Sequence, residues 1–390
     1  MGWAKEQLIK QQERSYGSSD KYICHGCVGN YYLKEFIQNN GNECICDYCN
    51  LIEISVCLEE LMEPIMNGIF QEYEDANDCM GYNGREGGFI GATTYDTYDL
   101  VYEELYEEFD FTNDDIYKDV YRLIDDSITW CQKDPYGELP YDEDLYTWKQ
   151  FARTLKKEGK DVKFIEDNDD LKTYSSVDKI LKRIGVGVKK LGLIEEMPVG
   201  TSLWRARVHL KSEIINSADS LGSPKNESAG CNRMNFKGES TFYGSFDKET
   251  ALSEIPNKDN MLRTIGVFRN VIPLTLINLY KIDKLIIPSL FDVEQSEKRM
   301  LLIFLKQFNK EISNPVEDEK EKEYLPTQKV MEYFKKILVT DDLKKIDGII
   351  YTSAQNSGGQ CCALFINAEQ CSDNCDKVLQ LDLNSIEQLA

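Results

Sequence analysis

The sequence predicts an α+β protein, with a mainly helical N-terminal domain stapled by zinc and a following domain built on a mostly antiparallel β-sheet. Three observations lead to this fold class. Two Cys-x2-Cys turns lie close together near the N-terminus. Apolar residues then recur at helical spacing through about residue 160. From Leu203 onward the pattern changes to short β-branched or aromatic runs bounded by turn-forming residues.

Length and composition are those of a folded protein with more than one domain. The chain has 390 residues, of which 42% are hydrophobic and 11% aromatic. No apolar run approaches the length of a membrane-spanning helix. The first residues show no apolar signal core, so we expect a cytoplasmic protein that does not bind membranes.

Negative charge is concentrated in the first part of the chain. The net charge is −23, and residues 1–160 hold 33 acidic and 14 basic residues, a net −19. Residues 161–390 hold 35 and 31, a net −4. Such a surface repels a phosphate backbone, so we expect no nucleic-acid partner.

The cysteines indicate a metal site. The chain has 13 of them and no secretory signal, which argues against a disulfide framework. Two Cys-x2-Cys turns separated by 18 residues are typical of a structural zinc site, with the ligands Cys24, Cys27, Cys46 and Cys49. His25 or Cys44 replacing a neighbour, a reduced cluster in a small core and a redox pair are the alternatives.

Periodicity predicts the elements of the N-terminal domain. Helices are expected over 54–80, 97–109, 114–131 and 145–158. Pro64 should kink or break the first of them, and Asn113 is a suitable N-cap for the third. Residues 81–94 carry five glycines and are expected to form a loop.

The remaining chain is expected to form a linker and a second domain. The predicted domains are 1–160, a linker with a bridging helix over 161–198, and 199–390. Strands are expected over 202–208, 240–246, 263–271, 274–280, 347–353 and 361–367. Helices are expected over 247–255, 294–310 and 327–338.

Histidine scarcity excludes several mechanisms. The only histidines are His25 and His209, and neither follows an arginine at the spacing that HEPN ribonucleases require. No nucleophile elbow accompanies them, so a Ser-His or Cys-His relay is not expected. A P-loop is also absent.

Two arginines alternate on the first strand of the second domain. Arg205 and Arg207 should share one face of the strand, opposite Trp204. A solvated strand face is one interpretation. A pyrophosphate clamp is the other, because each guanidinium fork binds two phosphate oxygens.

Further candidates follow in the stretch NRMNFKGESTFYGSFDKETALSE and near the C-terminus. Arg233 follows a Ser-, Gly- and Asn-rich loop suited to covering a ligand, and Tyr243 lies on the next strand. Glu254 ends a short helix, where the helix dipole disfavours a carboxylate. Ser353 lies where a strand enters a glycine turn. A surface acid and a turn serine are the alternative interpretations of the last two, and Glu239 and Glu249 are the competing acids.

The second domain resembles the RES family, named for its arginine, glutamate and serine. The matching pieces are LWRAR with Arg205, the stretch with Arg233, Tyr243 and Glu254, and DGIIYTSAQNSGGQCCALF with Ser353. The resemblance covers about residues 200–370. Residues 1–160 are similar to the HEPN/RES N-terminal domain. Two features depart from the family: Ala206 stands where some members have tyrosine, and the stretch between Glu254 and Ser353 is long, which suggests an added lid or partner surface.

The resemblance implies a fold related to ADP-ribosyltransferases and an activity that degrades NAD⁺. It assigns Glu254, Arg205, Arg233 and Ser353 to catalysis, and Tyr243 and Arg207 to binding NAD⁺. The expected function is an NAD⁺ glycohydrolase or phosphorylase acting as a bacterial toxin or phage-defence effector. The alternatives are ADP-ribosylation of a protein and a non-catalytic, partner-binding sensor. Expected partners are NAD⁺, an antitoxin or other regulatory protein, and a second copy in a homo-oligomer.

Overall fold

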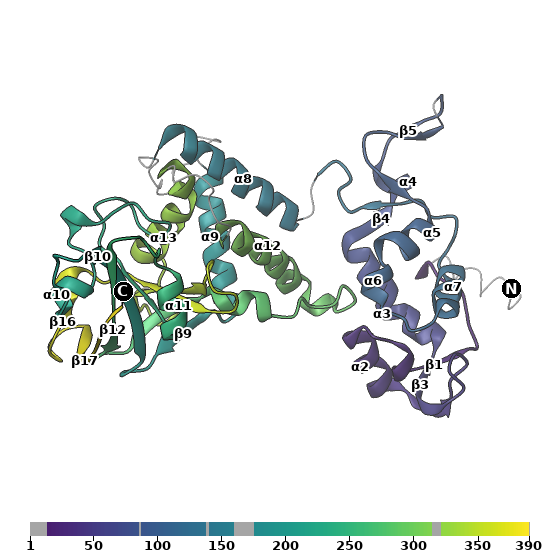
Figure 1. Ribbon diagram of the computed structural model, residues 1–390. Coiled ribbons are helices and arrows are strands. Elements are labelled where there is room, and N and C mark those ends of the chain that lie inside the picture. The colour runs from purple at the N-terminus through teal and green to yellow at the C-terminus, as the bar shows by residue number, and fades with distance from the viewer. Residues whose placement is uncertain (1–13, 86, 138–139, 160–174, 314–320, 390) are drawn as a thin grey trace, which may run out of the picture. The chain divides into compact units, whose positions relative to one another are not determined.

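The chain folds into two compact units (Figure 1). The computed structural model describes residues 14–85, 87–137, 140–159, 175–313 and 321–389. Unit 1 comprises Met1–Glu143 and Ile286–Leu301, and unit 2 comprises Asp144–Leu285 and Leu302–Ala390. Residues 161–174 of the predicted linker lie outside the described residues, and the bridging helix that follows is α9 (Ser175–Lys190). The expected α+β composition, with a helical N-terminal region and a mostly antiparallel sheet, is confirmed.

Unit 1 is mainly helical and carries small sheets. Its helices are α2 (Tyr31–Asn40), α3 (Leu58–Glu72), α4 (Ala76–Cys79), α5 (Thr97–Asp99), α6 (Tyr106–Phe109) and α7 (Asp114–Leu123), with a π-helix at Leu100–Glu104. Strands β1 (Tyr22–Cys24), β3 (Ile52–Cys57) and β2 (Asn42–Ile45) form one sheet, and β4 (Tyr73–Asp75), β8 (Trp130–Gln132) and β7 (Thr94–Tyr95) another. Strands β5 (Tyr82–Asn83) and β6 (Gly88–Phe89) pair within the predicted glycine loop.

Local sequence explains where these helices begin and end. Asn113 caps α7 as predicted, because its side chain accepts from the backbone N–H of Asp115 at 2.8 Å. Helix α3 continues through Pro64 rather than breaking. Its predicted start was wrong, since Ile54 pairs with Glu43 in the β2–β3 hairpin. The predicted helix over 114–131 also ends early, because Trp130 lies in β8 and is fully buried.

Residues 286–301, which follow the first part of unit 2 in the chain, fold as part of unit 1. The Arg299 guanidinium lies between Glu72 of α3 and Glu108 of α6, at 3.2 and 2.7 Å. It also donates to the Pro288 carbonyl at 2.8 Å. Burial disfavours its charge, but the two carboxylates outweigh burial and raise the pKa of Arg299.

Aromatic packing fixes the same segment. Phe291 stacks on Phe109 with ring centroids 5.2 Å apart. Gly68 in α3 permits this approach, because a Cβ there would lie 2.7 Å from the Phe291 ring. Ser289 and Asn30 exchange side-chain hydrogen bonds beside it. The segment is therefore part of the core of unit 1.

Unit 2 is built on one large sheet. Within the described residues, nine strands pair in the order β16-β17-β12-β10-β11-β15-β14-β13-β9. Their bounds are β9 (Ile194–Met197), β10 (Ser202–Leu210), β11 (Phe242–Ser245), β12 (Met261–Asn270), β13 (Leu274–Asn278), β14 (Gly348–Thr352), β15 (Gln360–Leu364), β16 (Cys371–Ser372) and β17 (Leu379–Leu389). Only β13–β14 and β16–β17 are parallel among these pairs. A buried apolar cluster that includes Leu203, Phe242 and Ile350 covers one face.

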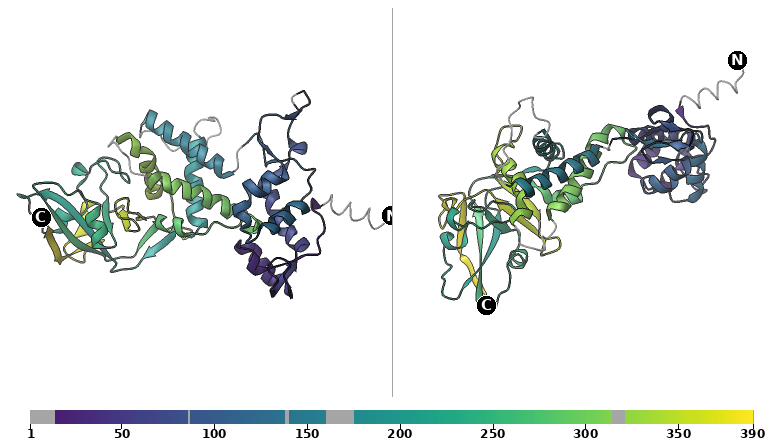
Figure 2. Two further views of the ribbon diagram at one scale, coloured as in Figure 1. Left: turned by 45° about the vertical axis from the view of Figure 1, so that its right-hand side comes forward. Right: turned by 90° about the horizontal axis from the view of Figure 1, so that it is seen from above.

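Helices gather beside this sheet (Figures 1 and 2). They are α8 (Pro140–Glu158), α9 (Ser175–Lys190), α12 (Ser296–Ser313) from Leu302 onward, and α13 (Leu325–Lys336), while α10 (Ala218–Leu221) and α11 (Lys248–Ser253) are short. Helix α8 was assigned to the N-terminal domain on sequence. It belongs to unit 2 because Trp148 packs edge-on against Phe308, with centroids 4.8 Å apart.

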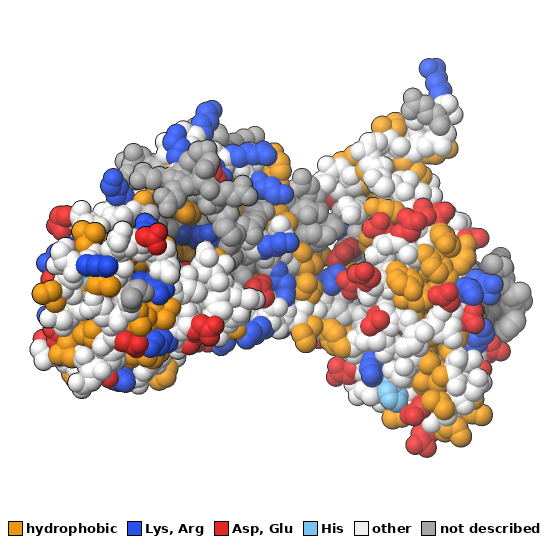
Figure 3. Space-filling model, viewed as in Figure 1, with side chains coloured by type: hydrophobic (Ala, Val, Ile, Leu, Met, Phe, Trp, Pro, Cys, Tyr) orange, Lys and Arg blue, Asp and Glu red, His pale blue; other side chains and the backbone are white. Residues whose placement is uncertain are grey.

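Acidic side chains are numerous on unit 1. Figure 3 shows them interspersed with hydrophobic side chains, tyrosines included, over the face of this unit that is in view. Tyr98 and Tyr102, both in this unit, stack with centroids 4.7 Å apart. In the part of the chain that the structure describes, no helix is both long and apolar enough to cross a membrane.

Replacing Arg299 should destabilise unit 1 strongly. Arg299→Ala removes the guanidinium that lies beside the buried Glu72 carboxylate, so we expect a loss of about 3 to 5 kcal/mol. Native-state hydrogen exchange of the α3 amides measures this change. Arg122→Ala is the control, because the Arg122 side chain is 72% exposed beside Asp119, and its loss should cost less than about 1 kcal/mol. Equal effects of the two variants would contradict the structural role of Arg299.

Candidate functional site

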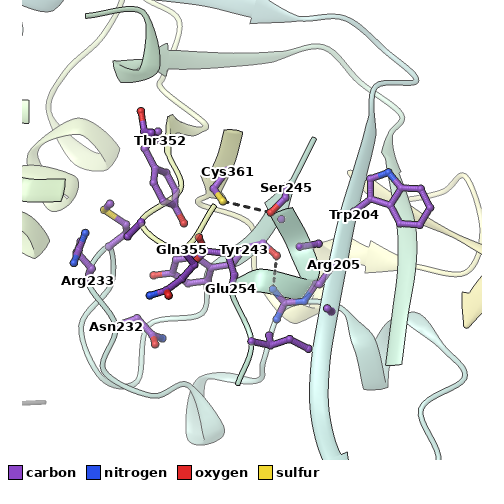
Figure 4. Close-up of a pocket in the computed structure, with 17 residues that line it drawn as sticks. Trp204, Arg205, Asn232, Arg233, Tyr243, Ser245, Glu254, Thr352, Gln355 and Cys361 are labelled. Carbon is purple, nitrogen blue, oxygen red and sulfur yellow. Dashed lines mark hydrogen bonds between the residues drawn. The ribbon is translucent and has the colours of Figure 1, made fainter. Parts of the chain in front are cut away.

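The candidate site is a pocket of about 310 Å³ in unit 2. It lies on the sheet face opposite the buried apolar cluster. Phe242 and Ile350 point into that cluster, whereas their strand neighbours Tyr243 and Tyr351 line the pocket. The walls come from β10, β11, β14 and β15, from α11 and from the two loops that precede β11 and β15 (Figure 4).

The sheet opens at this pocket. Strands β10 and β11 pair only at Trp204 and Ser245, whereas β10 pairs with β12 along its whole length. Gly244 allows the single close approach, because a Cβ there would lie 2.8 Å from the Phe242 ring and 3.3 Å from the Trp204 carbonyl. Beyond this point the strands diverge and leave room for a side chain between them.

The Arg205 guanidinium bridges this opening. It donates through Nε to the Leu221 carbonyl and through Nη1 to the Tyr243 carbonyl, both at 2.6 Å. It also lies over the Phe242 ring, 5.0 Å from the centroid. Arg205 comes from the strand face of Leu203, yet it lines the pocket because the strands are separated there.

Arg205 brings positive charge to the pocket. Burial lowers its pKa to about 10, which still leaves it protonated at neutral pH. Among the described residues, no carboxylate forms an ion pair with it, and its hydrogen bonds to Leu221 and Tyr243 use Nε and Nη1. Nη2 therefore remains able to donate to a ligand. A half-buried cation of this kind favours an anionic ligand.

Arg207 lies on the same strand face but not in the pocket. Its Nη1 donates to the Ser220 carbonyl at 2.6 Å, and its Nη2 lies 3.7 Å from Glu213. The side chain is exposed, and Arg207 does not line the pocket. Its contact with a ligand stays a prediction. The alternation predicted for Arg205 and Arg207 is present, but only Arg205 reaches the opening.

Glu254 and Ser353 meet, although 99 residues separate them in the chain. The Ser353 hydroxyl donates to Glu254 Oε1 at 2.5 Å. Glu254 is the C-cap of α11, lines the pocket and is exposed to solvent, whereas Ser353 is only 6% exposed. Because its proton is committed to the carboxylate, Ser353 orients Glu254 in this structure rather than facing a ligand itself.

Two local motifs fix this pair. The Ser353 oxygen accepts from the backbone N–H groups of Gln355 and Asn356 at 3.2 and 2.9 Å, which closes a serine turn. Asn356 then donates to the Thr250 hydroxyl of α11 at 2.8 Å. Asp247 caps the same helix through the Thr250 N–H at 2.7 Å. The turn and the helix that carry the two residues are thus joined directly.

Arg233 and Tyr243 line the other side of the site. Residues 232–235 form a tight turn, which we call the arginine turn, closed by backbone hydrogen bonds between Asn232 and Asn235 at 3.2 and 3.3 Å. Arg233 is its second residue. In Figure 4, Arg205 and Arg233 appear on opposite sides of Tyr243 and Gln355. Burial raises the pKa of Tyr243, whose hydroxyl donates to Asn235 Oδ1 at 2.6 Å.

Sequence reasoning missed several lining residues. Tyr351 and Cys361 lie on strands that were predicted, and alternation from Ser353 would have indicated that Tyr351 shares its face. Burial raises the pKa of Cys361 to about 12, so this thiol is protonated at neutral pH. Asn232 and Gln355 lie in turns, so the alternation of residues along a strand could not predict that they line the pocket.

In unit 1 the four predicted cysteines come together. The sulfur atoms of Cys24, Cys27, Cys46 and Cys49 all lie within 4.8 Å of one another. Cys24 lies 3.6 Å from both Cys27 and Cys49. Four sulfurs bound at about 2.3 Å to one tetrahedral zinc lie about 3.8 Å apart, so the donor set fits such an ion. His25 instead contacts the Ile54 carbonyl, and Cys44 is not part of the group.

Protonation of the thiols should oppose metal binding. Burial raises the pKa of Cys24 to about 11 and also raises that of Cys27. Burial also disfavours the Cys46 thiolate, but backbone N–H donors of Tyr48, Cys49 and Cys24 outweigh it and lower that pKa. A cation that binds thiolates must therefore displace protons, and its affinity falls with falling pH.

A second thiol group was not predicted. Glu74, Cys79 and Cys131 offer three ligand atoms within 4.8 Å of one another, and the two sulfurs lie 3.4 Å apart. Glu74 and Cys131 are cross-strand partners in β4 and β8. Burial raises the pKa of both thiols. Among the described residues this group has no fourth ligand, so it fits a structural metal less well.

Comparison with family models decides the relationship. A model described as HEPN/RES N-terminal domain 1 matches residues 39–169, and one described as RES domain matches residues 202–384. The chain carries a HEPN/RES N-terminal domain followed by a RES domain. No curated protein and no solved structure matches the chain.

The RES match contains every residue of the candidate pocket. Arg205, Arg233, Tyr243, Glu254 and Ser353 all fall within it, whereas Cys24 and Cys27 precede the match to the N-terminal domain. The predicted domain order is therefore confirmed. The RES family is consistent with an NAD-related, toxin-like enzymatic function.

Proposed function

We propose that this RES-domain protein cleaves the bond between nicotinamide and ribose in NAD⁺. One observation carries the proposal: Glu254, oriented by the Ser353 hydroxyl, lines the same pocket as the cationic Arg205 and the aromatic Tyr243. A carboxylate can stabilise an oxocarbenium-like ribose, a cation can bind a pyrophosphate, and an aromatic ring can pack on a nicotinamide. The likeness to ADP-ribosyltransferases that the family implies is part of this proposal.

Glu254 supplies the catalytic interaction. Nicotinamide leaves as a neutral molecule and needs no acid, whereas positive charge develops on the ribose as the C–N bond breaks. A carboxylate fixed beside the ribose stabilises that charge more in the transition state than in the ground state. The hydrogen bond from Ser353 holds Glu254 in one orientation, so little reorganisation accompanies the reaction.

The other residues bind the substrate. Arg205 donates to the pyrophosphate through Nη2, and Arg233 contributes a second cation. The Tyr243 ring packs on nicotinamide or ribose. A volume of about 310 Å³ is at the small end for ligand sites. We therefore assign the pocket to the nicotinamide riboside half of NAD⁺ and place the adenosine outside it.

The acceptor is water or inorganic phosphate. Hydrolysis forms the new bond between ribose C1″ and a water oxygen, and gives ADP-ribose, nicotinamide and one proton. Phosphorolysis forms a C1″–O bond to phosphate and gives ADP-ribose 1″-phosphate and nicotinamide. Both reactions balance without a further reactant. Arg233, at the tip of the arginine turn, is the residue we assign to an attacking phosphate.

We also propose that the activity depletes cellular NAD⁺ in a cytoplasmic toxin or phage-defence effector. An unrestrained enzyme of this kind would damage its own cell, which supports restraint by an antitoxin or another regulatory protein. The acidic surface of unit 1 makes a basic partner the better match. Co-purification of the full chain from its own cells would reveal such a partner.

Zinc is our proposal for the four-cysteine group. Four protein ligands leave no open coordination position, so the ion would stabilise the β1–β3 region and take no part in catalysis. The sulfur spacing in unit 1 supports this assignment.

The first prediction concerns Glu254. We expect purified protein to release nicotinamide from NAD⁺, and Glu254→Gln to lower kcat by about 10²- to 10³-fold because the charge facing the ribose is lost. Proton NMR of nicotinamide and ribose signals, with and without phosphate, measures the rate and identifies the acceptor.

Glu249→Gln is the matched control for this experiment. Glu249 lies on the same short helix but is exposed and does not line the pocket. Its variant should retain the wild-type rate. NAD⁺ left intact by the wild-type protein, in the presence and absence of phosphate, would count against the proposed reaction.

Substitutions of Arg205 and Arg207 should show which of the two arginines contributes to the KM for NAD⁺. Arg205→Lys removes the planar fork that both bridges the strands and faces the pocket, so we expect KM for NAD⁺ to rise at least tenfold. Arg207→Lys tests the prediction that Arg207 also binds NAD⁺. A comparable rise in KM would place it in the clamp, and an unchanged KM would remove it from the site.

Metal content tests the zinc assignment. We expect one zinc per chain by elemental analysis, and Cys46→Ser to lose most of it because only three thiolates remain. Cys44→Ser is the control, since Cys44 lies outside the group, and it should keep the metal. Full zinc content in Cys46→Ser would overturn the ligand set.

A further inference from the structure

A single buried amide connects the arginine turn with Tyr243. Asn235 is 4% exposed. Its Nδ2 group donates to the carbonyls of Gly230 and Phe236, both at 2.9 Å, and of Glu239 at 3.0 Å. Three carbonyls around one side of the amide can face only its NH₂ group, so the orientation of the side chain is fixed.

The oxygen of the same amide faces Tyr243, which lines the pocket. Asn235 Oδ1 accepts from the Tyr243 hydroxyl at 2.6 Å and from Asn232 Nδ2 at 3.2 Å. The phenolic proton of Tyr243 is therefore committed to the protein. A ligand in the pocket meets the Tyr243 ring, and the hydroxyl is not free to act as an acid.

Gln328 of α13 holds the arginine turn from behind. It is 1% exposed, and its Nε2 donates to the carbonyls of Asn232 and Asn235 at 2.7 and 2.9 Å. These are the two residues whose backbones close the turn around Arg233. Two buried amides, from different parts of the chain, thus fix one short turn.

We infer that Asn235, supported by Gln328, is a positioning residue that sets Arg233 and the Tyr243 ring in one geometry for the substrate. We call this pair of side chains the amide clasp. The inference rests on the proposed function, because it assigns to the clasp the orientation of two groups that bind NAD⁺. Neither amide lines the pocket, so each acts through the residues it holds.

Asn235→Asp separates the two roles of the Asn235 amide, which accepts from Tyr243 and donates to the turn. Aspartate keeps an oxygen that accepts from Tyr243, but it loses all Nδ2 donors to the turn. We expect kcat for nicotinamide release to fall about 100-fold, since a displacement of about 1 Å at a reacting group has an effect of that size. Hydrogen–deuterium exchange of the peptide covering 229–239 should become faster in the same variant. Gln328→Met, which keeps side-chain length but removes the donor, should accelerate the same peptide.

Asn270 offers a matched control in the same unit. It is 1% exposed, and its Nδ2 donates to the carbonyls of Pro198 and Ile272, both at 2.9 Å. It lies outside the pocket lining. Asn270→Asp should lower the melting temperature while leaving kcat and the exchange of 229–239 as in the wild type.

Several outcomes would overturn the inference. One is wild-type exchange of 229–239 in both Asn235→Asp and Gln328→Met, and another is an equal fall of kcat in Asn270→Asp and Asn235→Asp. Exchange is measured on the full chain without NAD⁺, so it decides whether the clasp holds the turn even if the wild-type protein releases no nicotinamide. Absence of nicotinamide release by the wild-type protein would instead contradict the proposed function.

Discussion

One guanidinium holds the candidate site open. Two neighbouring strands of a sheet normally satisfy each other's backbone groups, and their divergence leaves carbonyls that need donors. Arg205 satisfies the Tyr243 carbonyl on the diverging strand and the Leu221 carbonyl at the end of α10. The space between β10 and β11 therefore contains a positive charge rather than apolar packing. The pocket and its preference for an anion have the same physical origin.

The remaining groups of the site are carried by short elements that fix themselves locally. Asp247 caps the helix that ends at Glu254, and the serine turn begins at Ser353. Each of these motifs is satisfied within a few residues, and single long-range bonds then join them. Such a construction places a carboxylate at the edge of a rigid sheet without burying it, which suits a group that must meet a charged substrate.

The sequence predicted the order of the site residues better than their surroundings. The order of Arg205, Arg233, Glu254 and Ser353 was recognisable because it belongs to a family pattern, and Asn113 was recognisable because capping is local. Alternation also placed Arg207 beside Arg205, but it could not show that the sheet opens at only one of them. Strand divergence depends on pairing between distant segments, which one strand's residues do not encode.

The predicted boundary at residue 160 stays a prediction, because the N-terminal family match runs to residue 169 whereas the compact units divide at Asp144. Helix α8 has the same amphipathic pattern whichever unit it covers, and long-range contacts such as those of Trp148 with Phe308 and of Asp144 with Arg183 assign it to unit 2. The four-cysteine group was easier to predict, because each pair of cysteines comes from one short turn and the spacing within the pair is local. Predictions thus succeeded where a motif is local, as at Asn113, and failed where a strand partner decides the structure, as at Ile54 and Trp130.

Residues 286–301 fold as part of unit 1 although they lie within the sequence of the RES domain. The chain enters unit 1 a second time to deliver Phe291 and Arg299, then returns along α12. A gene fragment cut at the apparent domain boundary would carry this segment away from its partners, with an aromatic ring and an unpaired guanidinium exposed to water. The RES domain of this protein therefore cannot be exchanged as one independent stretch of sequence. Recombination that exchanges its N-terminal domain would also have to exchange sixteen residues in the middle of the other.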